Sequence, residues 1–397
     1  MSRPLEGIRV VDFTNVVAGP LCTQLLSDMG AEVIKVERVG EGDFFRKTSP
    51  EFVNGMSVSF MAFNRNKKSI TVDTTQEKGR EVAFKLVATA DVVVENFRPG
   101  VMDRLGLGYE VLSKSNPRII YCSISGYGQT GPYRRKAGQD LLVQGIAGVA
   151  SLMGDPGGPP VTMAISVCDL STAMLAAWGV TLAIVARDRF GVGQRVEANL
   201  LDSTLMMQSQ DAVRYLNTGQ LPMKVPINSA NPKSSPNGVF KTKDGYITIN
   251  ATSYERWTRL TGALGLQQLT DDERYNTLAK RAARTNEVRD LLEEVLAQKT
   301  NEEWLPILEK WDVLCSPIRT YDQVFTDPQV AHNNMVVTLQ HPTVGEVRVL
   351  GVPVKLSATP GSVDTPPPDL GQHTDELLES VGYRREDIEA MRRDKTV

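Results

Sequence analysis

Residues 7–38 read GIRVVDFTNVVAGPLCTQLLSDMGAEVIKVER, and this stretch decides the fold. Its first and last eight residues are short apolar runs, which are typical of buried strands. Between them, Leu21, Leu25, Leu26 and Met29 recur at the spacing of one helix face. The order strand, helix, strand predicts a βαβ unit with two parallel strands.

The same alternation continues along the first half of the chain. Strand-like runs stand at residues 69–75, 91–97 and 118–126, and a helical pattern stands at 77–90. Strands that alternate with helices predict an α/β fold whose parallel sheet is covered on both faces. Ligands of such sheets bind outside the carboxyl ends of the strands, so we expect the functional site at that edge.

We divide the chain into four parts. Residues 1–200 form a large domain, 201–224 a linker, and 225–325 a smaller α+β domain that includes the hairpin pattern GVFKTKDGYITIN. Residues 326–397 follow as a second linker and C-terminal segment. A Ser/Asn-rich stretch at 228–238, NSANPKSSPNG, looks like a surface loop.

Composition and charge exclude several classes of function. The 397 residues are 41% apolar and 23% charged, with a net charge of −3, so we expect no nucleic-acid partner. The most apolar stretch, 173–186, is interrupted by Gly179 and Thr181, and we interpret it as a core helix rather than a membrane span. The first residues lack a signal-peptide pattern and the four cysteines lie far apart, so we expect a cytoplasmic location.

The histidines are informative because they are so few. The sequence holds three, all beyond residue 330, which disfavours His-dependent triads and His-rich metal sites. The dinucleotide fingerprint G-x-G-x-x-G does not follow the first strand, and no P-loop motif occurs, so a dehydrogenase or nucleotide hydrolase is disfavoured.

Asp169 stands alone in the apolar stretch VTMAISVCDLSTAMLAAWGVTLAIVAR, residues 161–187. One interpretation is an N-cap, because an apolar helix that begins at Leu170 needs acceptors for its first N–H groups. The other is a nucleophile held at a helix N-terminus, where the helix dipole favours the ionised carboxylate. The residues alone leave both open.

A set of motifs carries a resemblance along the whole chain. In order, these include PLEGIRVVDFTNVVAGP, GAEVIKVER, NRNKKSI, DVVVENFRPGVMDRLGLGYE, NPRIIYCSISGYGQTGPY and LGQHTDELL. Their order and spacing resemble the family III CoA-transferases, which include formyl-CoA transferase and the succinyl-CoA-dependent dicarboxylate CoA-transferases. Several of them resemble the dicarboxylate enzymes more than formyl-CoA transferase.

The resemblance implies a Rossmann-like large domain that the C-terminal segment completes, and a dimer of interlocked chains. It also implies that Asp169 is the nucleophile, which forms first a mixed anhydride and then an aspartyl-CoA thioester. Such chemistry needs no metal and no permanently bound cofactor, because the coenzyme A thioester is itself a substrate.

The resemblance further implies a set of residues that contact CoA or flank the active site. They are Asn15, Val16, Ala18, Arg38, Val72, Asn96, Phe97, Arg104, Lys136 and Asp140. The sequence departs from the family at Val17, where formyl-CoA transferase has a Gln, and in the 228–238 loop, where it has a glycine-rich lid.

The acid that accepts CoA is predicted to be a short dicarboxylate, with succinyl-CoA as donor. Burying its second carboxylate requires a cation, and candidates are Arg46, Arg134 and Arg135, with Gln139 nearby. Two alternatives remain. An α-methylacyl-CoA racemase of the same family would carry His in place of Gln139, which cannot transfer a proton; a non-catalytic CoA-binding protein would need no carboxylate at position 169.

Overall fold

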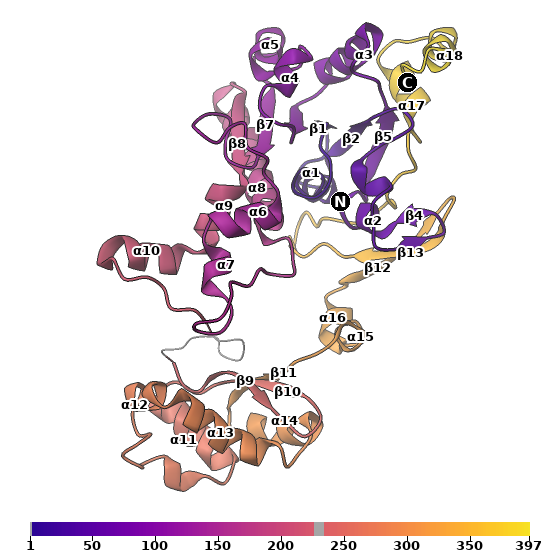
Figure 1. The fold of residues 1–397 in the computed structure, drawn as a ribbon. Coiled ribbons are helices and arrows are strands. Elements are labelled where there is room, and N and C mark those ends of the chain that lie inside the picture. Colours follow the sequence, from indigo (N-terminus) through magenta and orange to yellow (C-terminus); the bar gives the residue numbers. More distant parts are fainter. Residues whose placement is uncertain (1, 226–233) are drawn as a thin grey trace. The chain divides into compact units, whose positions relative to one another are not determined.

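The computed structural model describes residues 2–225 and 234–397. The chain forms two compact units (Figure 1). Unit 1 comprises Met1–Ala147, Ala164–Ser209 and Pro328–Val397, and unit 2 comprises Gly148–Met163 and Gln210–Asp327. The C-terminal segment therefore belongs to the same unit as the N-terminal βαβ pattern.

Unit 1 is built on a six-stranded sheet of order β5-β2-β1-β6-β7-β8. All neighbouring strands pair in parallel, with Val10 of β1 opposite Val33 of β2 and Val92 of β6. The predicted parallel α/β fold is confirmed. The strands are β1 Arg9–Asp12, β2 Glu32–Glu37, β5 Lys67–Thr71, β6 Val92–Glu95, β7 Ile120–Ser125 and β8 Gln194–Asn199.

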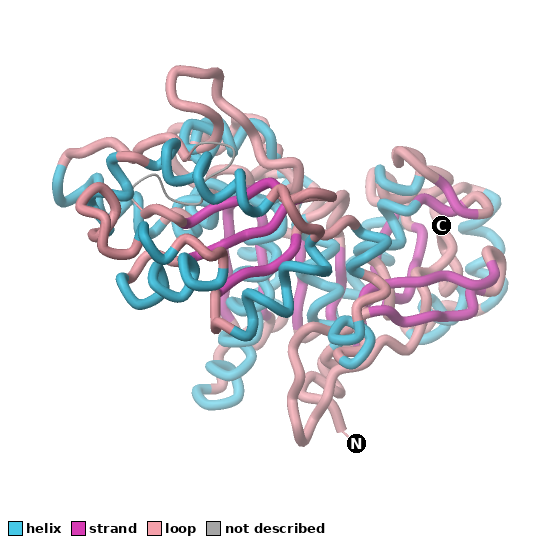
Figure 2. Tube along the Cα trace, turned by 90° about the horizontal axis from the view of Figure 1, so that it is seen from below, coloured by secondary structure: helices cyan, strands magenta, loops and turns pink. Residues whose placement is uncertain are grey.

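Helices cover both faces of this sheet, and in Figure 2 the strands (magenta) run between helices (cyan). One face packs on α1 (Ala18–Asp28) and α8 (Val167–Phe190), where Val10, Ile120 and Ala176 are fully buried. The other face packs on these helices: α3 Glu77–Ala88, α4 Val101–Arg104, α5 Tyr109–Ser115, α17 Thr374–Ser380 and α18 Arg385–Arg393. Because Leu377, Leu378 and Ile388 are buried in that layer, the C-terminal helices complete the core.

The remaining elements of unit 1 are short. They are η1 Phe44–Arg46, β3 Phe52–Val53, β4 Met56–Ser57, α2 Val58–Phe63, α6 Asp140–Ile146, α9 Leu200–Met207, α16 Pro328–His332, β12 Val336–His341 and β13 Gly345–Leu350.

Unit 2 packs helices against a three-stranded sheet of order β11-β10-β9. Its core contains Trp257, Leu260, Trp304 and Leu308. The elements are α7 Val149–Leu152, α10 Ser209–Thr218, β9 Asn237–Lys241, β10 Tyr246–Asn250, α11 Tyr254–Ala263, η2 Gln267–Leu269, α12 Leu278–Ala283, α13 Thr285–Leu296, α14 Asn301–Lys310, β11 Leu314–Pro317 and α15 Tyr321–Val324.

Two sequence predictions concern the connecting segments. Helices α9 and α10 occupy most of the linker predicted at 201–224, and the change from unit 1 to unit 2 falls after the first residue of α10. This helix pair was hard to recognise in the sequence because polar residues stand between its apolar ones. No side chain of α10 is buried in a core. Residues 226–233 of the predicted Ser/Asn-rich loop lie outside the described residues.

One helix in the described part of the chain, α8, is long and apolar enough to cross a membrane. Its most apolar window has a mean hydropathy of 1.6, and half of that window is buried inside the protein. The buried side includes Ala173, Ala176 and Val180, which pack in the core. The opposite side exposes Trp178 and Leu182, so the predicted core helix is buried on one side only.

Candidate active site

Helix α8 runs from the carboxyl edge of the sheet to the amino edge. It connects the parallel strands β7 and β8, so its first turn must lie near the carboxyl end of β7. Its last turn is fixed at the opposite edge, because Arg187 pairs at 2.7 Å with Asp91, which immediately precedes β6. Asp169 therefore lies on the edge where parallel sheets bind ligands.

The first turn of α8 is capped by a carboxylate from another helix. The Oδ2 atom of Asp140, the first residue of α6, accepts the N–H groups of Cys168 at 2.7 Å and Asp169 at 3.1 Å. Its Oδ1 atom accepts the side-chain amide of Gln144 at 2.6 Å. The cap interpretation of Asp169 is therefore wrong: the helix begins at Val167, and Asp140 satisfies its first donors.

The Asp169 carboxyl is left without a hydrogen bond or ion pair among the described residues, and its side chain is partly buried. Burial raises the pKa of this carboxyl to about 7, and the neighbouring charge of Asp140 adds to the effect. The expected stabilisation by the helix N-terminus is outweighed, because Asp140 occupies the N–H groups. A carboxylate that is unpaired, poorly solvated and partly ionised at neutral pH has the properties of a nucleophile.

This environment predicts an effect on stability. Asp169→Asn should raise the free energy of unfolding by about 1–2 kcal/mol at pH 8, where only the folded state suffers from an ionised, poorly solvated carboxylate. The gain should shrink as pH falls from 7 towards 4, because the folded carboxyl then takes up a proton before the unfolded one does. Urea unfolding across this range measures it. Asp188→Asn, at an exposed carboxylate on the same helix, is the control, and a gain of equal size there contradicts the prediction.

The loop between β1 and α1 lies at the same edge. The N–H of Asn15 donates to Oδ1 of Asn96 at 2.9 Å, and the amide of Asn96 donates back to the Asn15 carbonyl at 2.8 Å. This reciprocal pair ties together the loops after the neighbouring strands β1 and β6. Helix α1 then begins at Ala18 without a side-chain cap. Because its third residue, Pro20, has no N–H, the first-turn donors without an intrahelical acceptor are those of Ala18 and Gly19.

A cavity of about 230 Å³ opens at the ends of β6 and β7. It is lined by the cations Arg98, Arg134 and Lys136 and by no described carboxylate, so it suits an anionic ligand. Asn96, Phe97 and Gln139 also line it. The wall depends on two glycines, since a Cβ on Gly126 would lie 2.5 Å from the Cα of Gly138.

This cavity is linked along the chain to the carboxylate pair. Gln139 lines the cavity, and the next residue, Asp140, holds the head of α8 and therefore Asp169. The structure thus places several sequence-predicted residues in one region: Asn96, Phe97, Arg134, Lys136, Gln139, Asp140 and Asp169.

Three predicted CoA contacts lie elsewhere along the carboxyl edge. Arg38 follows β2, is exposed, and pairs with Glu41 at 2.9 Å. It also lies close enough to Asp73, after β5, to help the hydrogen bonds from Thr75 lower the pKa of that carboxyl. Arg104 is exposed at the end of α4. Val72 is buried in the core, so only its backbone could reach a ligand.

Arg46 is not the free cation that the sequence suggested. Its Nε and Nη2 atoms both donate to the Glu37 carboxylate at 2.7 Å, and Nη1 donates to the Pro368 carbonyl at 3.1 Å. Its guanidinium also lies 3.7 Å from the centre of the Phe60 ring. The guanidinium N–H groups that a substrate carboxylate would need already donate to Glu37, so Arg46 is excluded as the substrate anchor. Its remaining hydrogen bond holds the C-terminal segment at Pro368.

Sequence reasoning missed two features of the site. Arg98 lines the cationic cavity but was not singled out, although it stands in the motif VENFRPG. A buried charge network beneath the β1–α1 loop was also missed, with Asp12 paired to Lys67 and Asp43 paired to Lys35. The signal was a charged residue inside an apolar strand run, such as the lysine of EVIKVE.

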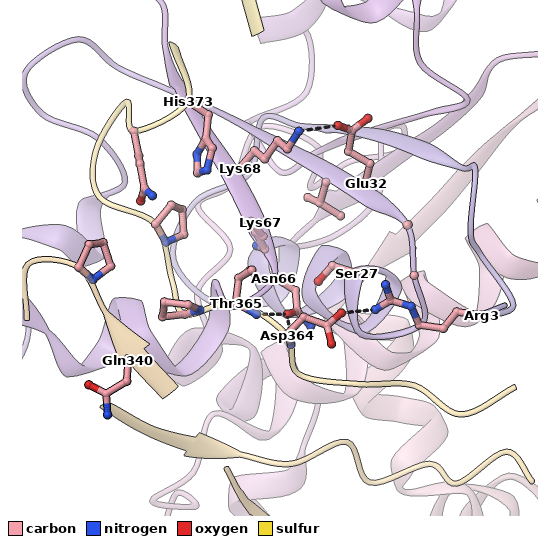
Figure 3. Close-up of a pocket in the computed structure, with 17 residues that line it drawn as sticks. Arg3, Ser27, Glu32, Asn66, Lys67, Lys68, Gln340, Asp364, Thr365 and His373 are labelled. Carbon is pink, nitrogen blue, oxygen red and sulfur yellow. Dashed lines mark hydrogen bonds and ion pairs between the residues drawn. The ribbon is translucent and has the colours of Figure 1, made fainter. Parts of the chain in front are cut away.

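A second cavity, of about 420 Å³, lies at the opposite, amino edge of β2 and β5 (Figure 3). Charged side chains line it, but they neutralise one another: Arg3 pairs with Asp364, and Lys68 pairs with Glu32 at 3.0 Å. It lies away from Asp169 and from the loops that follow the strands, so it is not the candidate active site.

The comparisons with known proteins show the family to which this fold belongs. A sequence model of CoA-transferase family III matches residues 5–374. The chain belongs to this family and is a CoA-transferase.

The chain is similar to the succinyl-CoA:glutarate CoA-transferase of Mus musculus, with 40% identity over 379 residues that cover 96% of this chain and 86% of the relative. It is 36% identical to a formyl-CoA:oxalate CoA-transferase of Bradyrhizobium sp., with coverage of 96% and 94%. The crystal structure of a CAIB/BAIF family protein from Brucella suis matches with a TM-score of 0.88 and 36% identity, covering 96% of this chain and all of that one.

Proposed function

We propose that this enzyme moves CoA from an acyl-CoA, such as succinyl-CoA, to a short dicarboxylic acid, with Asp169 as the nucleophile. The observation that carries the proposal is the unpaired, partly buried Asp169 carboxyl. Asp140, which caps its helix, directly follows Gln139 in a cavity whose charged lining residues are all cations. The names of two relatives, which contain glutarate and oxalate, support a dicarboxylate substrate.

The reaction needs a group that accepts the acyl chain and CoA in turn. A carboxylate oxygen of Asp169 attacks the thioester carbonyl, the C–S bond breaks, and CoA thiolate leaves behind a mixed anhydride. The thiolate then attacks the Asp169 carbonyl and releases the donor acid, which gives an aspartyl-CoA thioester. The acceptor carboxylate then attacks the aspartyl-CoA thioester, which releases CoA thiolate and gives a second mixed anhydride. The thiolate attacks the acceptor's carbonyl in this anhydride, so the acceptor acyl-CoA forms and the Asp169 carboxylate is regenerated. No net proton transfer is needed.

Negative charge that develops on the carbonyl oxygen needs donors. The uncapped first turn of α1 and the loop before it supply backbone N–H groups at the correct edge of the sheet. Val17 is apolar and buried, so it contributes no side-chain donor where formyl-CoA transferase has a Gln. CoA would lie along Asn15, Val16, Ala18, Arg38, Val72, Asn96, Phe97, Arg104 and Lys136.

A panel of acyl-CoA donors and free acids, with products identified by mass spectrometry, tests this function. New acyl-CoA species should form only when a donor ester and an acceptor acid are both present. Exchange of the α-hydrogen of a 2-methylacyl-CoA in D₂O, without a new ester, would instead indicate the racemase, and binding without turnover would indicate a CoA-binding protein.

We also propose a homodimer, interlocked as in the family and located in the cytoplasm. The exposed side of α8 carries an apolar stripe, Met174, Trp178, Leu182 and Val185, spaced by three or four residues. A second copy of this chain would cover such a stripe.

The dimer should persist on dilution, because interlocked chains cannot separate without unfolding. Light scattering and mass photometry should show twice the mass of the 43.6 kDa chain down to nanomolar concentrations. A monomer at those concentrations contradicts interlocking, and partition of the protein into vesicles would point to a membrane as the partner of α8.

A further inference from the structure

Val16 adopts a backbone conformation that its side chain disfavours. Its φ angle is 74°, in the left-handed region, where a β-branched residue is a genuine outlier. Neighbouring Asn15 is tied to Asn96, and Ala18 opens α1 two residues later. The strained residue therefore stands in the middle of the loop that would supply the N–H donors.

A buried carboxylate holds this conformation. Both oxygens of Asp43 accept the N–H of Val16, at 3.2 and 3.3 Å, and Oδ1 also accepts the N–H of Phe45 at 2.9 Å. Asp43 pairs with Lys35 at 2.9 Å, and neither side chain has any exposed surface. The ammonium of Lys35 in turn donates to the Thr14 carbonyl at 2.8 Å. The ion pair thus forms hydrogen bonds with the loop on both sides of Asn15, to the Thr14 carbonyl and to the Val16 N–H.

Stability alone does not explain this arrangement. A fully buried ion pair costs much of its attraction in lost hydration, and an apolar pair of similar volume often serves as well. Burial opposes the charge on Lys35, yet the charges of Asp43, Asp12 and Glu37 raise the pKa of this lysine, so the charged pair persists. What an apolar pair could not do is accept the N–H of Val16 and hold the left-handed turn.

We infer that Asp43 is a positioning residue, which keeps residue 16 left-handed so that the following N–H groups are aimed at the thioester carbonyl. The inference rests on the proposed function. It predicts that Asp43 acts on the chemical step through residue 16, and that its importance falls when residue 16 can adopt the left-handed conformation unaided. Glycine has that freedom, because it lacks a Cβ.

A double-mutant cycle tests this coupling. Asp43→Ala, which removes both acceptor oxygens, should lower kcat about 10- to 50-fold, with KM for the acyl-CoA changed less than about threefold. The same substitution in a V16G background should lower kcat less than about threefold relative to V16G alone. Equal losses in the two backgrounds, or a loss confined to KM, would overturn the inference, because a merely structural role for Asp43 does not depend on the backbone freedom of residue 16.

Asp43→Ala removes the ion-pair partner of the buried Lys35 and could prevent folding. The pair Lys35→Met and Asp43→Leu removes both charges together, and it should show the same loss of kcat and the same dependence on V16G. Crystal structures of the variants give a readout independent of activity: φ at position 16 should turn negative when Asp43 is replaced. If φ at position 16 stays positive in these variants, the inference fails even when the wild type transfers CoA. If φ changes but the wild type transfers no CoA, the proposed function fails instead.

Discussion

Asp169→Asn should abolish CoA transfer, with a loss in kcat of about 10⁴-fold or more, and should leave binding of the acyl-CoA largely unchanged. Removing a nucleophile eliminates the covalent route itself, whereas the cavity and loops that hold CoA are untouched. The amide is close in size to the carboxyl, and the N–H groups of the first turn remain capped by Asp140. Turnover followed by mass spectrometry and binding followed by calorimetry measure the two effects.

The covalent intermediate gives a second readout of the same prediction. Incubation of the wild type with an acyl-CoA should place a hydroxylamine-sensitive adduct on the peptide that contains Asp169, and the Asn variant should show none. Asp188→Asn, on the same helix at the opposite end, should behave as the wild type. Normal turnover by Asp169→Asn would show that another group is the nucleophile.

The rate should also follow the ionisation of Asp169. Only the ionised carboxylate attacks, and burial raises the pKa of this group to about 7. For the free enzyme, kcat/KM should therefore rise with pH through about 7 and level off above it. Asp140→Asn should move this limb to lower pH, because it removes the neighbouring charge that adds to the effect of burial.

The sheet could be predicted from sequence because its signals are local. Apolar runs such as RVVD of β1 and helical spacing such as that of α1 appear within a few residues of one another. The carboxyl edge followed from the parallel topology, and with it the neighbourhood of Asn15 and Asn96. Their actual contact, a reciprocal hydrogen bond, depends on side-chain geometry that no spacing encodes.

The errors arose where distant residues act on one another. Asp169 looked like a cap because Asp is a good N-cap, but the capping carboxylate is Asp140, which lies 29 residues earlier in the chain. Arg46 was predicted to be free for a substrate because nothing in the sequence marks Glu37, the last residue of β2, as its ion-pair partner. Lys35 gave a visible signal, a charge in a buried strand, yet the sequence could not name Asp43 as its partner.

Arg134→Ala should raise KM for a dicarboxylate acceptor by about 10- to 100-fold. An ionised second carboxylate must exchange water for a cation or several donors, and a charge-assisted bond to Arg contributes about 1.5–3 kcal/mol. Arg134 lines the cationic cavity next to the Asp140 segment, and Arg46 is already held by Glu37. Arg134→Lys should recover only part of the loss, since an ammonium cannot offer the planar fork.

Arg135→Ala is the matched control, because Arg135 is the adjacent exposed cation and does not line the cavity. It should leave KM for the dicarboxylate within about twofold of the wild type. KM and kcat for glutarate, succinate, malate, acetate and propionate should be measured in the wild type and in both variants. Loss of the dicarboxylate preference in Arg134→Ala alone supports the anchor, and equal effects of the two substitutions contradict it. A wild type that prefers acetate or propionate would refute the dicarboxylate proposal, while its membership of the CoA-transferase family would stand.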